Sequence, residues 1–445
     1  MASLQIPVTP DVRQSAIVLG AGPAGLTAAY RLAVSGCQVT LLSSSSLPDP
    51  QLTRAGDPPS PILGCHHATW ALLRALGVER SPSAFAEATL EFLLPDGRFA
   101  RYPKTWFPTP LRQLLTIGRF AGLPPSERWK LLTWLEQLWE GSLDLPPDLE
   151  QRTAQQWLES LGYSPASLQS VWNRLAGWLT DNDLGQLSAD AFVMALKPFF
   201  LSGGASSRIW VPQLAWDRIF IEPIKDALIK NRATMATPVE AVQFEIQEDR
   251  VSGVRLRDGT ILRAEWYVSA VGAPQLTPLL PERWLTRYAY FQHLVDLRTF
   301  PRRVIHACTA ATLTAPRHIL PSSGSFQWIA CMPSNADQHV RALLALPHDR
   351  AVANPEQEAT SLLRALKLLK ADAHLTGFSD EITASAALSL APGTKIRRPL
   401  QRSPIANLLL AGAWTDTGWP ANVESAIISG ERCADIILHR GTRAN

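Results

Sequence analysis

Three glycines near the amino terminus have the spacing of a turn that holds a dinucleotide. Gly20, Gly22 and Gly25 form a GxGxxG pattern, with Pro23 and Ala24 inside it, between a β-branched strand and an amphipathic helix. The first glycine permits the tight turn, the second lets the backbone approach a pyrophosphate, and the third lets the helix pack on the strand. The helix N-terminus supplies N–H groups and a positive dipole. The pattern therefore predicts a dinucleotide-binding site.

The residue that usually completes such a site is different here. An acidic side chain about 20 residues after the turn normally accepts hydrogen bonds from the ribose hydroxyls. In this chain the second strand ends at Leu42, and the next residue is Ser43, followed by further serines. One interpretation is a site for the 2′-phosphate of NADP, formed by the serine hydroxyls and Arg54. The other is a solvated loop from which the acidic contact has been lost.

A second glycine-rich segment lies near the carboxyl terminus. Residues 407–437 read as a strand, a loop punctuated by Gly and Pro, and a helix whose N–H groups at 420–424 can act as donors. Such an element can close over a bound cofactor. Its candidate cofactor-binding residues are Gly412, Trp414, Gly418, Trp419, Pro420 and Ala421.

This segment resembles the flavin motif of the FAD-dependent amine oxidase and phytoene desaturase superfamily. The TDTGxPA run at Thr415–Ala421, followed by Glu424 and Ser429-Gly430, is similar to the squalene-associated branch, hydroxysqualene dehydroxylase. Residues 62–77, the runs SRIWVP and EPIKDAL, and APGTKIRRP at 391–399 resemble the same family in the same order. The resemblance covers most of the chain.

The resemblance implies an α/β fold in which a Rossmann-like FAD-binding domain of the glutathione-reductase type is interleaved with a mixed α+β substrate domain. The backbone at Val239 would lie against the adenine, and the loop around Trp419, Pro420 and Ala421 would lie near the isoalloxazine ring. The implied FAD domain comprises residues 1–77, 212–275 and 401–445, and the implied substrate domain residues 78–211 and 276–400.

Several flavin contacts expected of that family are missing. The ribose-binding Glu is Ser43, residues 44–60 contain no Arg-x-Gly-Gly, and the Gly-Asp-Trp motif reads Gly412-Ala413-Trp414. Pro59 and Ser60 replace a Gln-His pair. Each hydrogen bond lost to a charged group is worth about 1.5–3 kcal/mol, so two lost carboxylates would remove roughly 3–6 kcal/mol of binding free energy. Tight FAD binding and weak or absent FAD binding both stay open.

Three functions are compatible with these patterns. The resemblance implies an FAD-dependent oxidoreductase acting on a long isoprenoid, reducing hydroxysqualene to squalene in hopanoid-type chemistry. The missing contacts motivate an alternative, a flavoprotein-fold subunit that has lost catalysis and tight FAD binding and serves to bind an isoprenoid or pigment or to assist assembly. A carotenoid desaturase or isomerase of the same superfamily is the third.

The sequence fixes no catalytic acid or base and shows no metal-ligand spacing. His66 and His67 adjoin the first flavin segment, where neighbouring histidines are more often structural. Asp416 could face the flavin or cap the helix that follows. Residues 98–140 mix cations, Lys104 and Arg112 among them, with aromatic side chains such as Trp106 and Trp129. That composition suits a membrane interface, or a helical domain with Trp in its core and Arg on a solvated face.

Composition excludes several classes of protein. With 445 residues, 46% hydrophobic and 18% charged, the chain is globular rather than disordered. A net charge of +3 gives no case for nucleic acid as a partner. The five cysteines are scattered without a CxxC pair, which argues against a disulfide framework or a zinc site. Neither a signal peptide nor a membrane-spanning run is recognised, so the expected location is cytoplasmic, with peripheral contact at the inner membrane face left open.

Periodicity and turn residues predict the order of the elements. The pattern is β-α-β over 16–43, a helix over 68–77, a hairpin over 91–101 that turns at Asp96-Gly97, and helical pieces over 108–177. Further along come a helix over 222–235, strands within 241–272, a helix over 355–375, and a final strand and helix.

Overall fold

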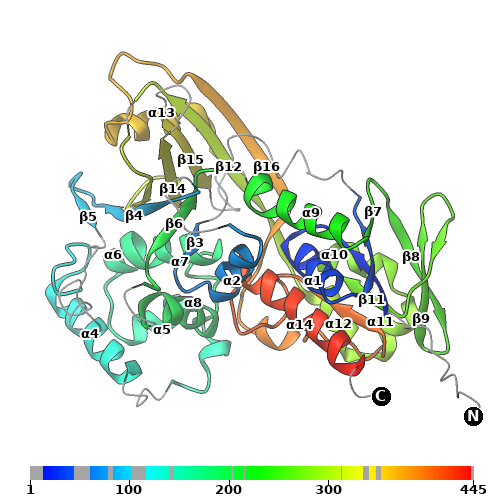
Figure 1. Cartoon of the computed structure of the whole chain (residues 1–445). Helices are drawn as coiled ribbons and strands as arrows, with labels where there is room; N and C mark the ends of the chain where they lie inside the picture. The colour runs from blue at the N-terminus through cyan, green and yellow to red at the C-terminus, as the bar shows by residue number, and fades with distance from the viewer. Residues whose placement is uncertain are drawn as a thin grey trace, which may run out of the picture.

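The described part of the chain forms two large β-sheets and one small β-sheet, with helices packed against them (Figure 1). The computed structural model describes residues 14–44, 61–78, 84–101, 117–139, 145–201, 205–214, 216–311, 313–333, 340–346 and 352–441. Arg54, Pro59, Ser60, Lys104, Trp106 and Arg112, and most of the stretch expected to hold Arg-x-Gly-Gly, lie outside these residues.

The first sheet is parallel throughout, in the order β17-β11-β1-β2-β7. Its strands are β1 (Ser15–Leu19), β2 (Gln38–Leu42), β7 (Thr234–Ala236), β11 (Trp266–Ser269) and β17 (Leu408–Leu410). Parallel strands are buried on both faces, and along β1 Ala16 and Val18 belong to one buried cluster while Ile17 and Leu19 belong to another. The first cluster also contains the helices α1 (Pro23–Val34), α9 (Glu222–Lys230) and α14 (Val423–Gly441). The predicted Rossmann-like α/β fold is confirmed.

Segments from both ends of the chain meet in this layer. In Figure 1 the red helix α14 lies beside the blue helix α1. A Cβ placed on Gly430 of α14 would lie 2.3 Å from the carbonyl oxygen of Ala24 in α1. Glycine at this position therefore permits the close approach of the last helix to the first one.

A small antiparallel sheet follows β7. It consists of β8 (Ala241–Gln247), β9 (Arg250–Leu256) and β10 (Ile261–Leu262), in the order β10-β9-β8. Glu248 and Asp249 turn between β8 and β9 with φ of +50° and +56°. The strands predicted within 241–272 are confirmed.

The second large sheet is mixed, in the order β16-β12-β15-β14-β13-β4-β6-β3, with β5 paired to β4. Pairing between β13 and β4 is parallel, and the hairpin predicted over 91–101 is confirmed as β4 paired antiparallel with β5. The strands are β3 (Ile62–Leu63), β4 (Phe85–Leu93), β5 (Phe99–Arg101), β6 (Ile209–Pro212), β12 (Thr299–Thr309), β13 (Arg317–Pro321), β14 (Trp328–Pro333), β15 (Val340–Leu346) and β16 (Gly377–Leu388).

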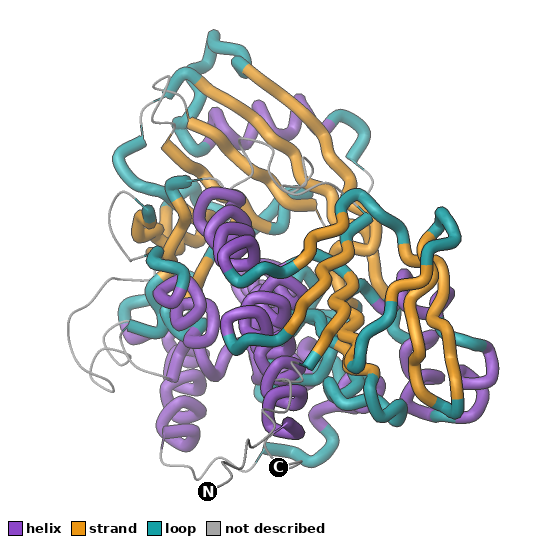
Figure 2. The backbone as a smooth tube through the Cα atoms, turned by 45° about the vertical axis from the view of Figure 1, so that its right-hand side comes forward, coloured by secondary structure: helices purple, strands orange, loops and turns teal. Residues whose placement is uncertain are grey.

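Helices pack against this sheet, and Figure 2 shows helices in purple and strands in orange. Those from α4 to α8 lie below the sheet in the view of Figure 1. The helices not yet named are α2 (His67–Ala75), α4 (Pro125–Trp139), α5 (Ala154–Ser160), α6 (Pro165–Ser167), α7 (Asn173–Thr180), α8 (Ala189–Leu201), α10 (Ala273–Leu276), α11 (Glu282–Arg287), α12 (Ala289–Asp296) and α13 (Pro355–Ala365).

Two predicted helices are too long. The helix expected over 222–235 ends at Lys230, because Arg232 takes φ of +58° and residues 234–236 instead form β7 beside β2. The helix expected over 355–375 ends at Ala365, and Lys367 follows with φ of +58°. A left-handed backbone at an arginine or lysine carries no sequence signal, since glycine is the usual residue there.

Aromatic residues within 98–140 divide between core and surface. Phe120 packs edge-on against Phe92 at 5.0 Å, and Trp134 against Trp157 at 5.9 Å, whereas Trp129 on the same helix is 71% exposed. None of the described helices is both long and apolar enough to cross a membrane. Contact with a membrane surface stays a prediction.

Candidate functional site

The three glycines of the amino-terminal turn occupy three different environments. Gly20 has φ of +99°, and a Cβ there would lie 2.9 Å from the carbonyl oxygen of Ala270. A Cβ on Gly25 would lie 1.9 Å from the carbonyl oxygen of Gly20, so this is the point where α1 touches β1. A Cβ on Gly22 would meet no atom within 4 Å. Backbone at Gly22 is therefore open to a ligand, while the other two glycines pack against protein.

The N-terminus of α1 points its backbone donors toward that opening. Gly22 is the N-cap residue, no side chain caps the helix, and Pro23 is the first helical residue. Ala24, next in the turn, is buried. Uncapped N–H groups and the helix dipole favour a bound anion at this position.

A cavity of about 790 Å³ lies over this turn. It brings together four of the predicted site residues, Gly20, Gly22, Ser43 and Val239. The N–H of Val239 donates to the carbonyl oxygen of Ser43 at 2.7 Å, which holds the segment before β8 against the end of β2. The other lining residues are Leu19, Ala21, Leu42, Ser44, Glu240, Ala241, Val242, Ala270, Val271, Gln275, Pro278 and Leu279.

The predicted residues of the carboxyl-terminal segment lie in the loop between β17 and α14, outside the lining of this cavity. Trp414 is nearly buried, and its indole N–H donates to the carbonyl oxygen of Val271 at 3.1 Å. The same indole lies over Gly412, where a Cβ would be 2.3 Å from Nε1. Since Val271 also lines the cavity, the loop is attached directly to one of its walls.

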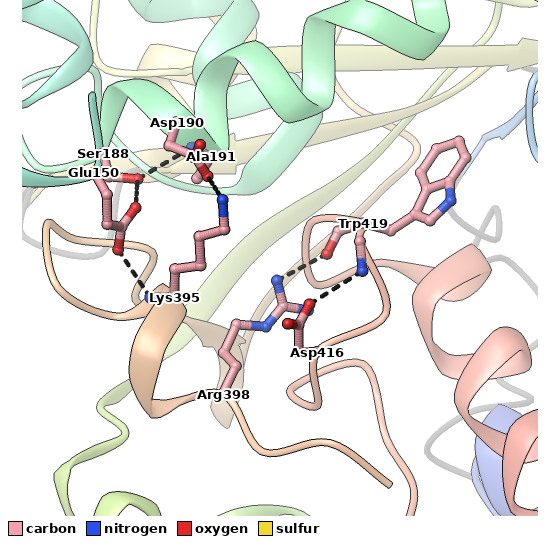
Figure 3. A network of polar contacts seen from close by, with 9 residues as sticks. Glu150, Ser188, Asp190, Ala191, Lys395, Arg398, Asp416 and Trp419 are labelled. Atoms are coloured by element: carbon pink, nitrogen blue, oxygen red, sulfur yellow. Dashed lines mark hydrogen bonds and ion pairs between the residues drawn. The ribbon is translucent and has the colours of Figure 1, made fainter. Parts of the chain in front are cut away.

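Arg398 holds this loop in place, as Figure 3 shows in part. It lies just after a short helical turn, Lys395–Arg397, and is buried. Burial lowers the pKa of its guanidinium to about 10. The guanidinium donates to the backbone carbonyl oxygens of Ala413 (3.0 Å), Trp414 (3.4 Å), Thr415 (2.7 Å) and Trp419 (2.8 Å). Sequence analysis did not single out this residue, although it lies in the APGTKIRRP run.

Asp416 does not cap α14. Its carboxylate accepts the N–H of Gly418 at 3.1 Å and so closes a tight turn, in which Gly418 has φ of +82° (Figure 3). The side chain of Asn422 caps α14 instead, accepting the N–H of Ser425 at 2.9 Å. The loop therefore has its own internal supports before the helix begins.

His66 lies against the same loop. Its ring meets Trp419 edge-on at 5.6 Å, and its Nδ1 accepts the N–H of Leu63 at 3.3 Å. Burial, and to a lesser degree the neighbouring His67, lower the pKa of the imidazole to about 3. The ring is therefore neutral with its proton on Nε2, and this buried N–H has no hydrogen-bond partner among the residues that the structure describes.

Glu424 connects helix α14 to the start of helix α2. Its buried carboxylate accepts the N–H groups of Ala68 (2.8 Å) and Thr69 (2.9 Å) and the Thr69 hydroxyl (2.6 Å), at the N-terminus of α2. Burial raises the pKa of this carboxyl group. The contact fixes α14 on α2, and with it Trp419 near His66. No group of three or more His, Cys, Asp or Glu among the described residues is arranged to hold a metal ion.

A family model for flavin-containing amine oxidoreductases matches residues 59–438 of this chain. The chain belongs to that family. It is accordingly a flavin-dependent oxidoreductase, and the superfamily expected from the carboxyl-terminal motif is confirmed.

Related curated proteins include carotene desaturases. The zeta-carotene desaturase of Synechocystis is 24% identical over 483 residues, covering 96% of this chain and 97% of the relative. The 15-cis-phytoene desaturase of Synechococcus elongatus is 24% identical over 350 residues, covering 70% of this chain and 71% of the relative. The tomato 15-cis-phytoene desaturase is 23% identical and covers 95% of this chain and 77% of the relative.

Solved structures share the fold. An oxidoreductase from Methanosarcina mazei superposes with a TM-score of 0.70 at 14% identity, over 94% of this chain and 99% of the other. Putrescine oxidase superposes with a TM-score of 0.68 at 18% identity, over 96% of this chain and all of the other. At these identities the likeness concerns the arrangement of the chain alone.

The adenosine half of the site fits the FAD that this family implies. Open backbone at Gly22 and the uncapped start of α1 suit the pyrophosphate, and the cavity beyond Ser43 and Val239 suits the adenosine. The imidazole of His66, whose buried Nε2–H finds no partner in the described part of the chain, contacts Trp419, where the resemblance puts the isoalloxazine ring. Ser43 and Ala413 still lack the carboxylates expected of the family.

Proposed function

We propose that this protein is an FAD-dependent desaturase or isomerase of a long, carotenoid-type isoprenoid. The observation that best supports this proposal is the match to zeta-carotene desaturase over nearly the full length of both proteins. The proposal favours the carotenoid alternative over reduction of hydroxysqualene, because the relatives that match are named for carotene substrates. The TDTGxPA run is similar to the squalene-associated branch.

The five-part division of the chain belongs to this proposal. Residues 1–77, 212–275 and 401–445 would form the FAD domain, because they contribute all strands of the parallel sheet. Residues 78–211 and 276–400 would form the substrate domain, to which 62–63 also add the edge strand β3. Peripheral membrane contact is part of the proposal too, since a long isoprenoid dissolves in lipid.

Each part of the described site has a task in such a reaction. Bound FAD would accept the hydride removed from the isoprenoid. Gly22 and the start of α1 would hold the pyrophosphate, and Val239 the adenine. Arg398 fixes the loop that carries Trp419, and His66 presents a neutral N–H donor beside that loop. Such preorganised donors orient a cofactor at little cost, because their own positions are already fixed by packing.

The test is product analysis with the purified, FAD-supplemented protein. Phytoene, zeta-carotene and hydroxysqualene would be supplied separately in liposomes, with a soluble quinone to take up the electrons of desaturation and a reductant in the hydroxysqualene arm. We expect new conjugated polyenes, with absorption at longer wavelength than the substrate, in a carotene arm. A change in double-bond geometry alone would indicate an isomerase.

Two other outcomes would redirect the proposal. Conversion of hydroxysqualene to squalene, with both carotenes unchanged, would instead support the hypothesis of a hydroxysqualene dehydroxylase. Failure to convert any of the three by protein with a stoichiometric flavin spectrum would overturn the substrate class. A matched control is the variant Gly22→Ala, which blocks the pyrophosphate position without a clash in the fold and should abolish turnover.

A further inference from the structure

Glu240 is the one charged residue among the described residues that line the cavity of about 790 Å³ over the glycine turn, here called the adenosine cavity. We propose that its carboxylate binds the ribose diol of the adenine dinucleotide, in place of the acidic residue missing from the end of β2. This inference rests on the proposed FAD cofactor. It adds a binding residue that the GxGxxG pattern does not predict, because Glu240 lies far along the chain from that turn.

The backbone places Glu240 beside the position of the lost carboxylate. Its neighbour Val239 donates its N–H to the carbonyl oxygen of Ser43 at 2.7 Å, and Ser43 follows the last residue of β2. Both Ser43 and Glu240 line the cavity. A carboxylate that this fold normally draws from β2 can therefore reach the ribose from the facing segment.

One oxygen of Glu240 is already positioned by protein and the other is available. Oε1 accepts a hydrogen bond from the guanidinium of Arg257 at 2.5 Å, and Oε2 has no hydrogen-bond partner among the described residues. The Glu240 side chain is 49% exposed, as a residue at the rim of an open cavity must be to meet a ligand. Arg257 thus orients the carboxylate, while Oε2 can accept a ribose hydroxyl.

The negative charge of Glu240 distinguishes between the two interpretations of Ser43, a site for the 2′-phosphate of NADP and a loop from which the acidic contact has been lost. A 2′-phosphate would be placed against a carboxylate and repelled, whereas a free diol donates to it. No cation is among the described residues that line the cavity. The geometry therefore points to a dinucleotide with an unmodified ribose, such as FAD, rather than to one with a 2′-phosphate.

The experiment measures dissociation constants of the purified full-length protein for FAD and FMN by calorimetry. We expect Glu240→Ala to weaken FAD about 10- to 100-fold, which is the range for one hydrogen bond to a charged group. FMN lacks the adenosine half, and its binding should not change. Glu245→Gln is the matched control: Glu245 pairs with Arg255 at 2.6 Å in the same β8–β9 hairpin but does not line the cavity. It should leave both constants unchanged.

Two further arms test the ribose itself. In competition with FAD, wild type should bind ADP more tightly than 2′-deoxy-ADP, and Glu240→Ala should lose this preference. Ser43→Glu restores an acidic residue at the end of β2, so it should tighten FAD binding and reduce the effect of Glu240→Ala.

Each failure has its own meaning. Equal FAD affinity for wild type and Glu240→Ala, at equal melting temperature, would overturn the role of Glu240 and leave the FAD cofactor standing. Tighter binding of NADP than of NAD by wild type would overturn it as well. Absence of any FAD binding by wild type would instead remove the proposed function on which the inference rests.

Discussion

At the scale of single residues, two glycines of the same turn should respond in opposite ways to one added methyl group. Gly25→Ala brings a Cβ to 1.9 Å from the Gly20 carbonyl oxygen, so backbone must move. Such overpacking typically costs about 1–3 kcal/mol of unfolding free energy. Gly22→Ala meets no protein atom within 4 Å, so the flavin-free fold should keep its stability. Urea unfolding of the two flavin-free variants measures this difference.

FAD affinity should show the reverse order. In Gly22→Ala the new methyl group stands where a pyrophosphate approaches the backbone, so the dissociation constant for FAD should rise although the protein is folded. The idea fails if Gly22→Ala binds FAD as tightly as wild type does, or if it unfolds as readily as Gly25→Ala. Titration of each flavin-free variant with FAD, followed by flavin fluorescence, is sufficient to decide.

At the scale of elements, the loop between β17 and α14 depends on one buried cation. Replacing Arg398 by Met removes the guanidinium donor from four carbonyl oxygens, of which that of Ala413 keeps a second donor, the Ser425 hydroxyl at 3.2 Å. Stability should fall by about 2–5 kcal/mol, since each buried group left unpaired costs about 1–3 kcal/mol and relaxation recovers part of the sum. Arg398→Lys keeps the charge but cannot span the carbonyls, so it should recover less than half of the loss.

The neighbour Arg397 provides the control for this experiment. Its side chain forms no hydrogen bond with the described residues, although it lies in the same turn of chain, so Arg397→Met should change stability by less than about 0.5 kcal/mol. Urea unfolding gives both values, and limited proteolysis reports whether the loop becomes accessible. Equal effects of the Arg397 and Arg398 replacements would refute the assigned role of Arg398.

Elements formed by local pattern were predictable from the sequence, and those fixed by distant contacts were not. The β1-α1-β2 unit, the β4–β5 hairpin and the strands β8–β11 follow from alternation, helical periodicity and turn residues. The ends of α9 and α13 were misjudged, because Arg232 and Lys367 take a left-handed backbone that their residue types do not signal. The helix-favouring composition of these segments therefore led to predicted helices that extend beyond the true ends of α9 and α13.

The residues of the candidate site likewise fall into those that the sequence predicts and those that only the folded structure reveals. Gly20, Gly22 and Gly25 were predictable because their spacing is itself the signal. Glu424 binds Ala68 across 356 positions of sequence, so only the folded chain could reveal the contact. Glu240 was missed for a similar reason: it joins the site only because Val239 is paired with Ser43. Long-range pairing leaves no mark on local composition.

At the scale of the whole molecule, acid should weaken the fold in a defined pH range. His66, shortly after β3, and His318, in β13, are both buried, and burial lowers their pKa values to about 3 and about 4, against 6.5 for an ordinary histidine. Unfolding lets both rings take up a proton. Stability is therefore complete above pH 6.5 and falls as the pH drops toward 4 and 3, by about 2 kcal/mol for each ring at pH 5.

Thermal melts between pH 7 and pH 5 check this expectation. His66→Gln and His318→Gln remove the titrating ring, so each should flatten the dependence of melting temperature on pH, and the double variant should flatten it most. His374→Gln, at an exposed position, is the control and should keep the wild-type slope. An unchanged slope in both buried variants would contradict the burial argument.

Binding of FAD should stabilise the molecule as one unit, because its cavity is built from chain segments around residues 20, 43, 240 and 275. A ligand that binds only the folded state adds about 2.7 kcal/mol at 100 times its dissociation constant. With two family carboxylates absent, that constant is expected in the micromolar range, so the melting temperature should rise only as FAD reaches hundreds of micromolar. FMN, without the adenosine half, should raise it less, and ADP should produce part of the FAD effect. A melting temperature independent of FAD up to millimolar concentration would show that the remaining contacts, Glu240 included, do not compensate for those lost at Ser43 and Ala413.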